Sequence, residues 1–149
     1  MPRDNIPVDS PETTPENYPP RLRLTVMTAK EFRERALDDA AAVEAGEQPD
    51  AVKAYSDLSQ LRELLTPRRL DVMESVMRAP PASISALADR LERNYADVHA
   101  DVELLVDHGI AMYRQDGRAK QPMIPYEEIV VEATLARVSE GPDGDRVEA

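Results

Sequence analysis

Between residues 66 and 126, apolar positions recur first with helical spacing and then with the alternation of a strand. Three helices are predicted here, because each apolar stripe follows a residue that can cap a helix: Thr66, Ser83 and Asn94. The expected inward residues are Leu70, Met73, Val76 and Met77 in the first helix, Ile84, Leu87, Ala88 and Leu91 in the second, and Val98, Val102, Leu105 and Val106 in the third.

A hairpin is predicted after the third helix. Gly109 supplies a left-handed stop for that helix, and residues 110–114 then alternate as a strand does. Asp116-Gly117 favours a tight turn into a returning strand over residues 120–124. The order of three helices and a hairpin predicts an α+β fold with a winged helix-turn-helix core, in which the third helix is the recognition helix and the hairpin is the wing.

The rest of the chain divides by composition. Residues 1–20 combine many prolines with Ser, Thr and acids, which is typical of a disordered tail, and residues 139–149 predict a second one. Residues 21–65 predict an N-terminal strand-helix extension of the winged helix-turn-helix domain, to which we assign residues 66–138.

The extension contains four predicted elements. These are a strand with Leu22, Leu24 and Val26, a helix with Phe32, Ala36, Leu37, Ala40 and Val43, a short strand over residues 52–55, and a helix with Leu58, Leu61, Leu64 and Leu65 that Ser56 or Asp57 caps. Residues 129–135 predict one more strand after the wing. The extension is too small to stand alone, so we expect it to pack on the winged helix and to form a homodimer, because a strand and an Ala-rich amphipathic helix both provide surface for self-association.

The segment LADRLERNYADVHADVELLVDHGI resembles the helix-turn-helix of MarR-like regulators, which commonly read LAxxLGLSxxTVSRHLxxLExxGLV. The shared positions are Leu87, Ala88, Leu91, Val98, Val102, Leu105, Gly109 and Ile110. Glu92 and Arg93 depart from the pattern, because they occupy the turn where that family has Gly and an apolar residue. This turn is therefore expected to be more exposed, or differently bent.

The longer segments LTPRRLDVMESV, DVHADVELL and DGRAKQPMIPYEEI resemble a group of small proteins of halophilic archaea that are regarded as DNA-binding. This resemblance extends from about Leu22 to Leu135. It implies a DNA-binding role for the chain.

The net charge of the chain bears on the expected DNA-binding role. The chain carries a net charge of −11, which opposes binding to phosphates. Only three of its 18 basic residues are Lys, a balance similar to that of proteins from salt-accumulating organisms, in which molar salt shortens the screening length to about 3 Å. Residues 66–120 hold 8 basic and 9 acidic side chains, so the candidate DNA-binding segment is almost neutral.

In a winged helix, the exposed N-terminal half of the third helix meets base edges. Asn94, Tyr95 and His99 are the candidates for this contact, against the alternative that Asn94 is only a cap, Tyr95 a surface aromatic and His99 a rim residue. Asp97 and Glu103 argue against the contact because they repel phosphate. Another acid of this helix, Asp101, has the alternative of pairing with a nearby Arg as a structural residue.

The wing is the more favourable part of the candidate interface. Arg114, Arg118 and Lys120 surround the predicted turn, where their charges can reach the DNA backbone or the minor groove, although a hairpin tip is also where solvated charges ordinarily lie. Arg68, Arg69 and Arg93 are weaker candidates for phosphate contacts.

No catalytic or metal-binding pattern competes with this interpretation. The chain has no Cys, and its two histidines, His99 and His108, are roughly 13 Å apart along one predicted helix. There is no apolar run long enough for a membrane span and no signal-like N-terminus, so we expect a cytoplasmic protein with no cofactor and no enzymatic activity.

The leading hypothesis is a homodimeric transcriptional regulator that binds double-stranded DNA. The alternative is a winged-helix module that binds another protein, such as a component of the transcription machinery or a toxin. The acids of the third helix favour the alternative.

Overall fold

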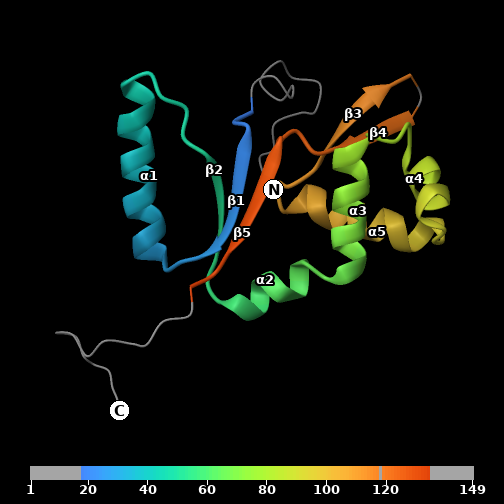
Figure 1. Cartoon of the computed structure of the whole chain (residues 1–149), viewed down its shortest axis with the longest axis horizontal. Helices are drawn as coiled ribbons and strands as arrows, with labels where there is room; N and C mark the ends of the chain where they lie inside the picture. The colour runs from blue at the N-terminus through green and yellow to red at the C-terminus, as the bar shows by residue number, and fades with distance from the viewer. Residues whose placement is uncertain (1–17, 118, 135–149) are drawn as a thin grey trace, which may run out of the picture.

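A computed structural model describes residues 18–117 and 119–134 of the chain (Figure 1). Both predicted tails therefore lie almost wholly outside the described residues. The described elements are, in order, β1 (Arg21–Val26), α1 (Ala29–Glu44), β2 (Ala51–Tyr55), α2 (Leu58–Leu64), α3 (Pro67–Arg78), α4 (Ile84–Leu91), α5 (Tyr95–Asp107), β3 (Met112–Asp116), β4 (Ala119–Met123) and β5 (Glu128–Glu132).

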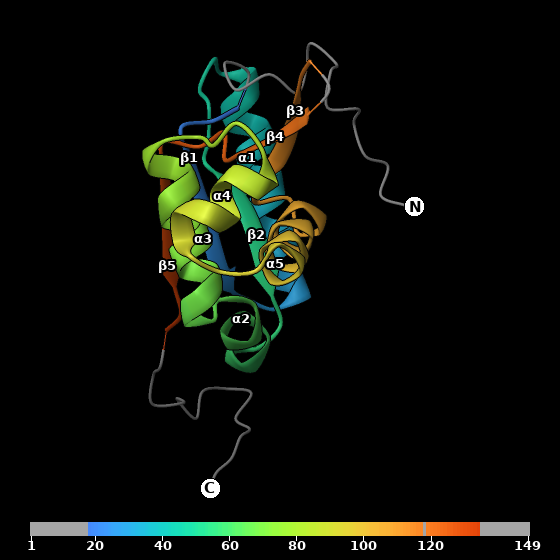
Figure 2. The same cartoon turned by 90° about the vertical axis from the view of Figure 1, so that its right-hand side faces the viewer.

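The predicted α+β fold with a winged helix-turn-helix core is confirmed. Helices α3, α4 and α5 pack on one another beside the β3–β4 hairpin, as Figures 1 and 2 show. The predicted caps are also correct, since the side chains of Thr66, Ser83 and Asn94 each accept a hydrogen bond from the backbone N–H three residues later. Gly109 follows α5 with a φ of 78°, the left-handed conformation that its position requires.

The hairpin turn lies one residue later than the sequence predicts. Asp116 pairs with Ala119 in the antiparallel ladder, so Asp116 belongs to β3 and the turn begins at Gly117. Gly117 has a φ of 64°, which explains why a glycine is favoured there. Strand β3 also begins later than predicted, at Met112, because the N–H groups of Ile110 and Ala111 both donate to the carbonyl of Leu105 at the end of α5.

The apolar face of α3 is rotated relative to the predicted one. Leu70 is 37% exposed, so its assignment to the core is wrong, whereas Val72 and Ser75 are buried beside Met73 and Val76. Helix α3 packs against α4, α5 and β4 together, and the direction from which these neighbours approach selects its buried face. That direction is not contained in the local pattern of α3.

The three remaining strands form a parallel sheet in the order β2-β1-β5. Leu24 of the central strand lies opposite Lys53 of β2 and Val131 of β5. The strands predicted at Leu22–Val26 and 52–55 are confirmed, and the last predicted strand is observed as Glu128–Glu132. The chain therefore returns after the wing to complete the sheet that its N-terminal segment began (Figure 1).

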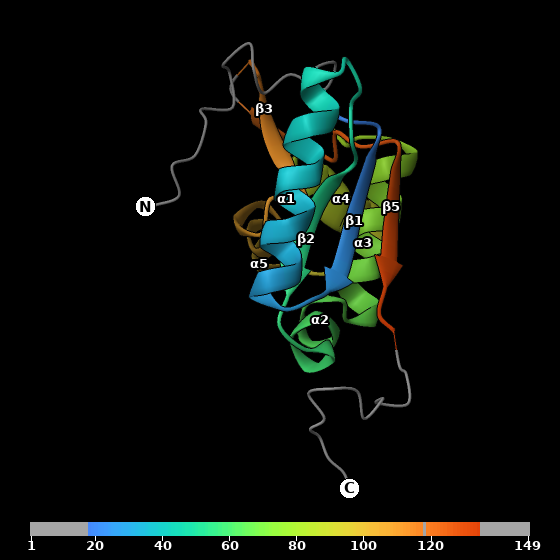
Figure 3. The ribbon, with the colours of Figure 1, turned by 90° about the vertical axis from the view of Figure 1, so that its left-hand side faces the viewer.

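The two faces of the sheet differ in character. Leu22 and Leu24 are buried in the core shared with the winged helix, whereas the intervening Arg23 lies on the face where α1 stands. Figure 3 shows α1 in front of β2, with β1 and β5 beside it on the same face. Helix α2 follows β2 with Asp57, one of the two expected caps, at its N-cap, and it buries Leu61 and Leu64.

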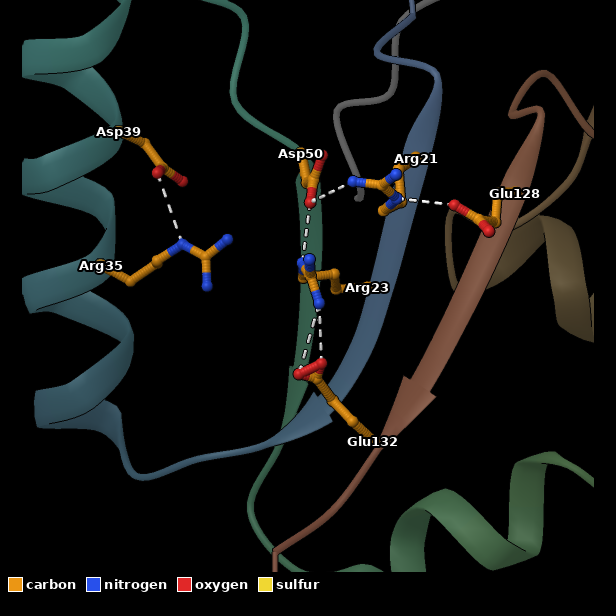
Figure 4. A network of polar contacts seen from close by, with 7 residues as sticks. All are labelled: Arg21, Arg23, Arg35, Asp39, Asp50, Glu128 and Glu132. Carbon is orange, nitrogen blue, oxygen red and sulfur yellow. Dashed lines mark hydrogen bonds and ion pairs between the residues drawn. The ribbon is translucent and has the colours of Figure 1, made fainter.

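Ion pairs connect the three strands on the α1 side (Figure 4). Arg21 lies 2.7 Å from Glu128 of β5 and 3.6 Å from Asp50, which precedes β2. Arg23 lies 2.7 Å from Asp50 and 2.8 Å from Glu132 of β5. Each partly exposed pair contributes little alone, but the five charges alternate in sign across the strands and favour this strand order.

Candidate nucleic-acid interface

The buried side of α5 fixes which residues it presents outward. Val98, Val102 and Leu105 face the core, and this turns Tyr95, Asp97 and their neighbours Ala96 and Ala100 to the surface. Asn94 acts as the expected N-cap, because its Oδ1 accepts from the N–H of Asp97 at 2.9 Å. Its Nδ2 also donates to the Asp97 carboxylate at 3.0 Å, so the two side chains engage each other at the start of the helix.

A chain of contacts runs from the start of α5 toward the wing. The rings of Tyr95 and His99 stack with centroids 5.6 Å apart, and Nε2 of His99 lies 3.8 Å from the Glu103 carboxylate. Tyr113 of β3 donates a hydrogen bond to the same carboxylate. Lys120 of β4 places its ammonium 5.1 Å from the centroid of the Tyr113 ring, a distance that permits a cation–π interaction.

Tyr113 is the residue that sequence reasoning missed in this region. Its hydroxyl joins the wing to the outward side of α5, and its burial, together with the bond to Glu103, raises the pKa of Tyr113. The phenol therefore stays protonated and donates to the carboxylate. A tyrosine four residues after Gly109, the predicted stop of the third helix, gives no local signal of this contact.

A cluster of largely buried charges connects α5 to its neighbours. It consists of Asp101 of α5, Arg69 of α3 and Arg93 of the turn between α4 and α5. Nη2 of Arg93 lies 2.8 Å from Asp101, and Nε of Arg69 lies 3.4 Å from the other oxygen of the same carboxylate. The alternative that Asp101 pairs with a nearby Arg is thus confirmed. The side chains of Arg69, Arg93 and Asp101 are 19%, 17% and 14% exposed, so this carboxylate is largely neutralised and shielded.

Arg69 has a second set of partners. Its Nη1 donates to the carbonyls of Glu63 at 2.9 Å and Leu64 at 3.0 Å, which close the end of α2. Arg69 therefore connects the end of α2 to α5 through Asp101. The guanidinium groups of Arg69 and Arg93, both candidates for phosphate contact, point to protein acceptors in this structure.

Three other basic candidates lie at the surface. Arg68 at the start of α3, Arg114 in β3 and Lys120 in β4 are all exposed. Arg118, the third basic candidate of the wing, lies outside the described residues. The exposed cations thus come from the wing and from α3, whereas the sequence of α5 itself contains no Lys or Arg and carries Asp97, Glu103 and Asp107 away from its buried side.

A hollow of about 530 Å³ lies between the start of α3 and α5. Arg68 and Asp97, both exposed, line it together with Ala100 and the Arg93–Asp101 pair. The charges along this hollow are mixed in sign.

The second histidine occupies a separate site. Nδ1 of His108, at the C-terminal end of α5, lies 3.1 Å from the hydroxyl of Tyr55 in β2. Burial, and then the nearby Lys53, lower the pKa of His108, and burial raises the pKa of Tyr55 to about 12. A neutral imidazole and a neutral phenol therefore share this hydrogen bond, and the imidazole tautomer decides which of them donates. Among the described residues, no group of three His, Asp or Glu side chains is placed to hold a metal ion.

Helices α3 to α5 and the β3–β4 hairpin define the class of this protein as a winged helix-turn-helix. A sequence model of the family described as HVO_A0114 matches residues 64–131, which run from the end of α2 into β5. No curated protein matches the chain. Within the described ranges, no helix is long and apolar enough to cross a membrane.

Several solved structures match this fold. One is the winged helix-turn-helix DNA-binding domain of Mb0332 from Mycobacterium bovis, which is described as homodimeric and as part of a possible ArsR-family transcriptional regulator. The identity is 18%, the match covers 68% of this chain and 77% of that one, and the TM-score is 0.42.

Proposed function

We propose that this protein is a cytoplasmic DNA-binding transcriptional regulator, as its resemblance to MarR-like regulators and to the proteins of halophilic archaea implies. The observation that carries the proposal is the arrangement of α5 and the wing. The N-terminal half of α5 is exposed, and the wing beside this helix carries the exposed Arg114 and Lys120. The hydrogen bond from Tyr113 to Glu103 joins the wing to α5.

In this proposal the start of α5 enters the major groove. Asn94, Tyr95 and His99 lie toward the base edges, while Arg114, Arg118 and Lys120 contact the backbone or the minor groove. Arg68 reaches a phosphate beside the start of α3. Arg69 and Arg93 contribute mainly by holding α5 through Asp101, which keeps a third carboxylate of the recognition helix away from DNA.

The acids of α5 oppose DNA binding less than their number indicates. Asp97 is hydrogen-bonded to the Asn94 amide, and Glu103 accepts from Tyr113 and lies near His99. Asp107 lies at the far end of the helix, more than three turns from Asn94. The net charge of the contact surface then depends chiefly on the wing.

The wing provides the test. A DNA sequence is first selected from a random library with the intact protein, and its affinity is measured by fluorescence anisotropy over a range of KCl concentrations. Replacing Arg114, Arg118 and Lys120 together by Gln is expected to weaken binding to all sequences by about tenfold or more, and to reduce the salt slope by about one for each lost phosphate contact.

Arg62→Gln is the control, because Arg62 is an exposed residue of α2 outside the proposed contact surface. This variant should leave the DNA affinity and its salt slope almost unchanged. Equal affinity of the wing variant and the wild type would remove the wing from the interface. Failure of the intact protein to enrich any sequence would reject the proposal.

A second function is favoured by one observation, the absence of Lys and Arg from α5 beside its three outward acids. In this alternative, the outward face of α5 and the hollow beside Arg68 bind a basic segment of another protein. The variant with Glu103→Gln and Asp107→Asn separates the two functions. It should strengthen DNA binding if α5 faces phosphates, and it should weaken capture of a basic partner if α5 faces protein.

A further inference from the structure

Helix α1 presents an apolar face that the fold leaves uncovered. None of its 16 residues, all of them described, is buried. Phe32 is 41% exposed, Leu37 72% and Val43 59%, and the exposed Ala36 and Ala40 lie between them along the helix. At 100° per residue, Phe32, Ala36, Ala40 and Val43 fall within about 80° of one another and make an apolar face, whereas Leu37 lies beyond the charged Arg33 and Glu44.

The side of α1 that is turned toward the sheet is polar instead. Arg35 and Asp39 are half-buried, form an ion pair of 3.4 Å one turn apart, and project toward the strands in Figure 4. Phe32, at the edge of the apolar face, lines a hollow with Val52 and Tyr55 of β2, whereas Ala36, Ala40 and Val43 are exposed. The greater part of the apolar face therefore does not meet the rest of the chain. A helix of this length without buried side chains is marginally stable in water, even with the Thr28–Glu31 capping box that begins it.

The charges beside the apolar face indicate what covers it. Exposed Lys30 and Arg33 lie in the first half of α1, and exposed Glu44 lies at its end on the same flank. A second α1 in antiparallel orientation brings the basic half of each helix against the acidic end of the other, and it also opposes the two helix dipoles. A parallel pair places like charges together. The alanines in the middle allow close approach of the two backbones.

We propose that a second copy of this chain covers α1, and that the two α1 helices pack antiparallel about a two-fold axis near Ala36 and Ala40. The biological use of this dimer rests on the proposed function, since two copies read a two-fold related DNA site. The dimer itself does not depend on DNA.

Cysteine cross-linking tests the geometry, because the chain has no Cys of its own. Ala36→Cys or Ala40→Cys is introduced alone, the protein is oxidised, and products are separated on a non-reducing denaturing gel. At least one of these variants is expected to give a disulfide-linked dimer. Val43→Cys should remain monomeric on the gel, because its two copies lie roughly 15 Å apart along antiparallel helices centred between Ala36 and Ala40. A cross-link at Val43 with none at Ala36 or Ala40 would overturn the antiparallel arrangement.

A matched pair of variants tests the face. Ala36 and Ala41 are both exposed on α1 but lie about 140° apart around the helix. Ala36→Glu should raise the dimer dissociation constant, measured by analytical ultracentrifugation, by about tenfold or more, whereas Ala41→Glu should change it by less than about threefold. Equal effects of the two variants, or a wild-type chain that stays monomeric at all concentrations, would overturn the proposal. The ultracentrifugation is carried out without DNA, so its result is independent of the DNA-binding measurement. A wild-type chain that is monomeric in the centrifuge but binds a selected DNA sequence would reject the dimer and retain the proposed function.

Discussion

Asp101 lies between two guanidinium groups and sets the position of α5. Its two carboxylate oxygens meet Arg93 at 2.8 Å and Arg69 at 3.4 Å, and Arg69 also binds the last carbonyls of α2. Nε of Arg69 and Nε of Arg93 are buried and make no hydrogen bond in the structure. Arg69 Nε is within ion-pair distance of Asp101, but its geometry is not that of a hydrogen bond. The two arginines therefore depend on this carboxylate for neutralisation.

Asp101→Asn is expected to lower the free energy of unfolding by about 1–3 kcal/mol, since it leaves two half-buried guanidinium groups without an anion while residual solvent contact moderates the loss. Urea unfolding followed by circular dichroism measures it. Asp107→Asn, at an exposed position of the same helix, is the control and should cost less than about 0.5 kcal/mol. An equally small effect at Asp101 would show that the cluster does not stabilise the fold.

The turn between α4 and α5 is the element that departs from the MarR-like pattern. Glu92, the C-cap of α4, has a φ of 58° and is the only non-glycine residue with a positive φ in the described ranges. Hydrogen bonds from the N–H of Glu92 to Asp89 and from the N–H of Arg93 to Ala88 close the helix. Glu92 is exposed, as the sequence predicts for a polar turn, so the motif keeps its geometry with a residue that is strained there.

Glu92→Gly is expected to raise the free energy of unfolding by up to about 1 kcal/mol, because glycine adopts a left-handed conformation without a Cβ clash, and this gain exceeds the greater freedom of the unfolded chain. Thermal unfolding of the two proteins measures the difference. Glu92→Gln keeps the strain and removes only the charge, so it should leave stability unchanged. A destabilised glycine variant would contradict the assigned turn conformation.

At the scale of the whole molecule, the parallel sheet and the winged helix share one core. Leu22 and Leu24 of β1 belong to the same cluster of buried residues as Leu87 of α4 and Val98 of α5. Strand β5 follows the wing along the chain and pairs with the edge of β1 that is opposite to β2. Unfolding of the sheet is therefore expected to accompany unfolding of the winged helix.

Leu24→Ala and Leu70→Ala compare the same substitution at two sites. Leu24 is fully buried and Leu70 is 37% exposed, so the first is expected to cost about 2–4 kcal/mol and the second less than about 1 kcal/mol. Hydrogen exchange measures whether Leu24→Ala also lowers protection in α3 to α5, as a shared core requires. Unchanged protection in those helices would show that the sheet unfolds separately.

Prediction from the sequence was most successful where one residue decides the local structure. Thr66, Ser83 and Asn94 cap their helices as expected, since a short polar side chain reaches only its own helix start. It was least successful where distant residues decide. The buried face of α3 was misplaced at Leu70, and the joint binding of Arg69 and Arg93 to Asp101 brings together residues from two helices and a turn.

The sequence by itself determined the succession of helices and strands, because caps, turn glycines and apolar spacing act over a few residues. Only the tertiary structure decided that β5 joins the N-terminal strands, that Tyr113 binds Glu103, and that the apolar side of α1 stays uncovered. These features depend on contacts between segments far apart in the chain. An amphipathic pattern predicts that a helix has an apolar face, and the packing of the other elements decides whether that face is buried in the same chain.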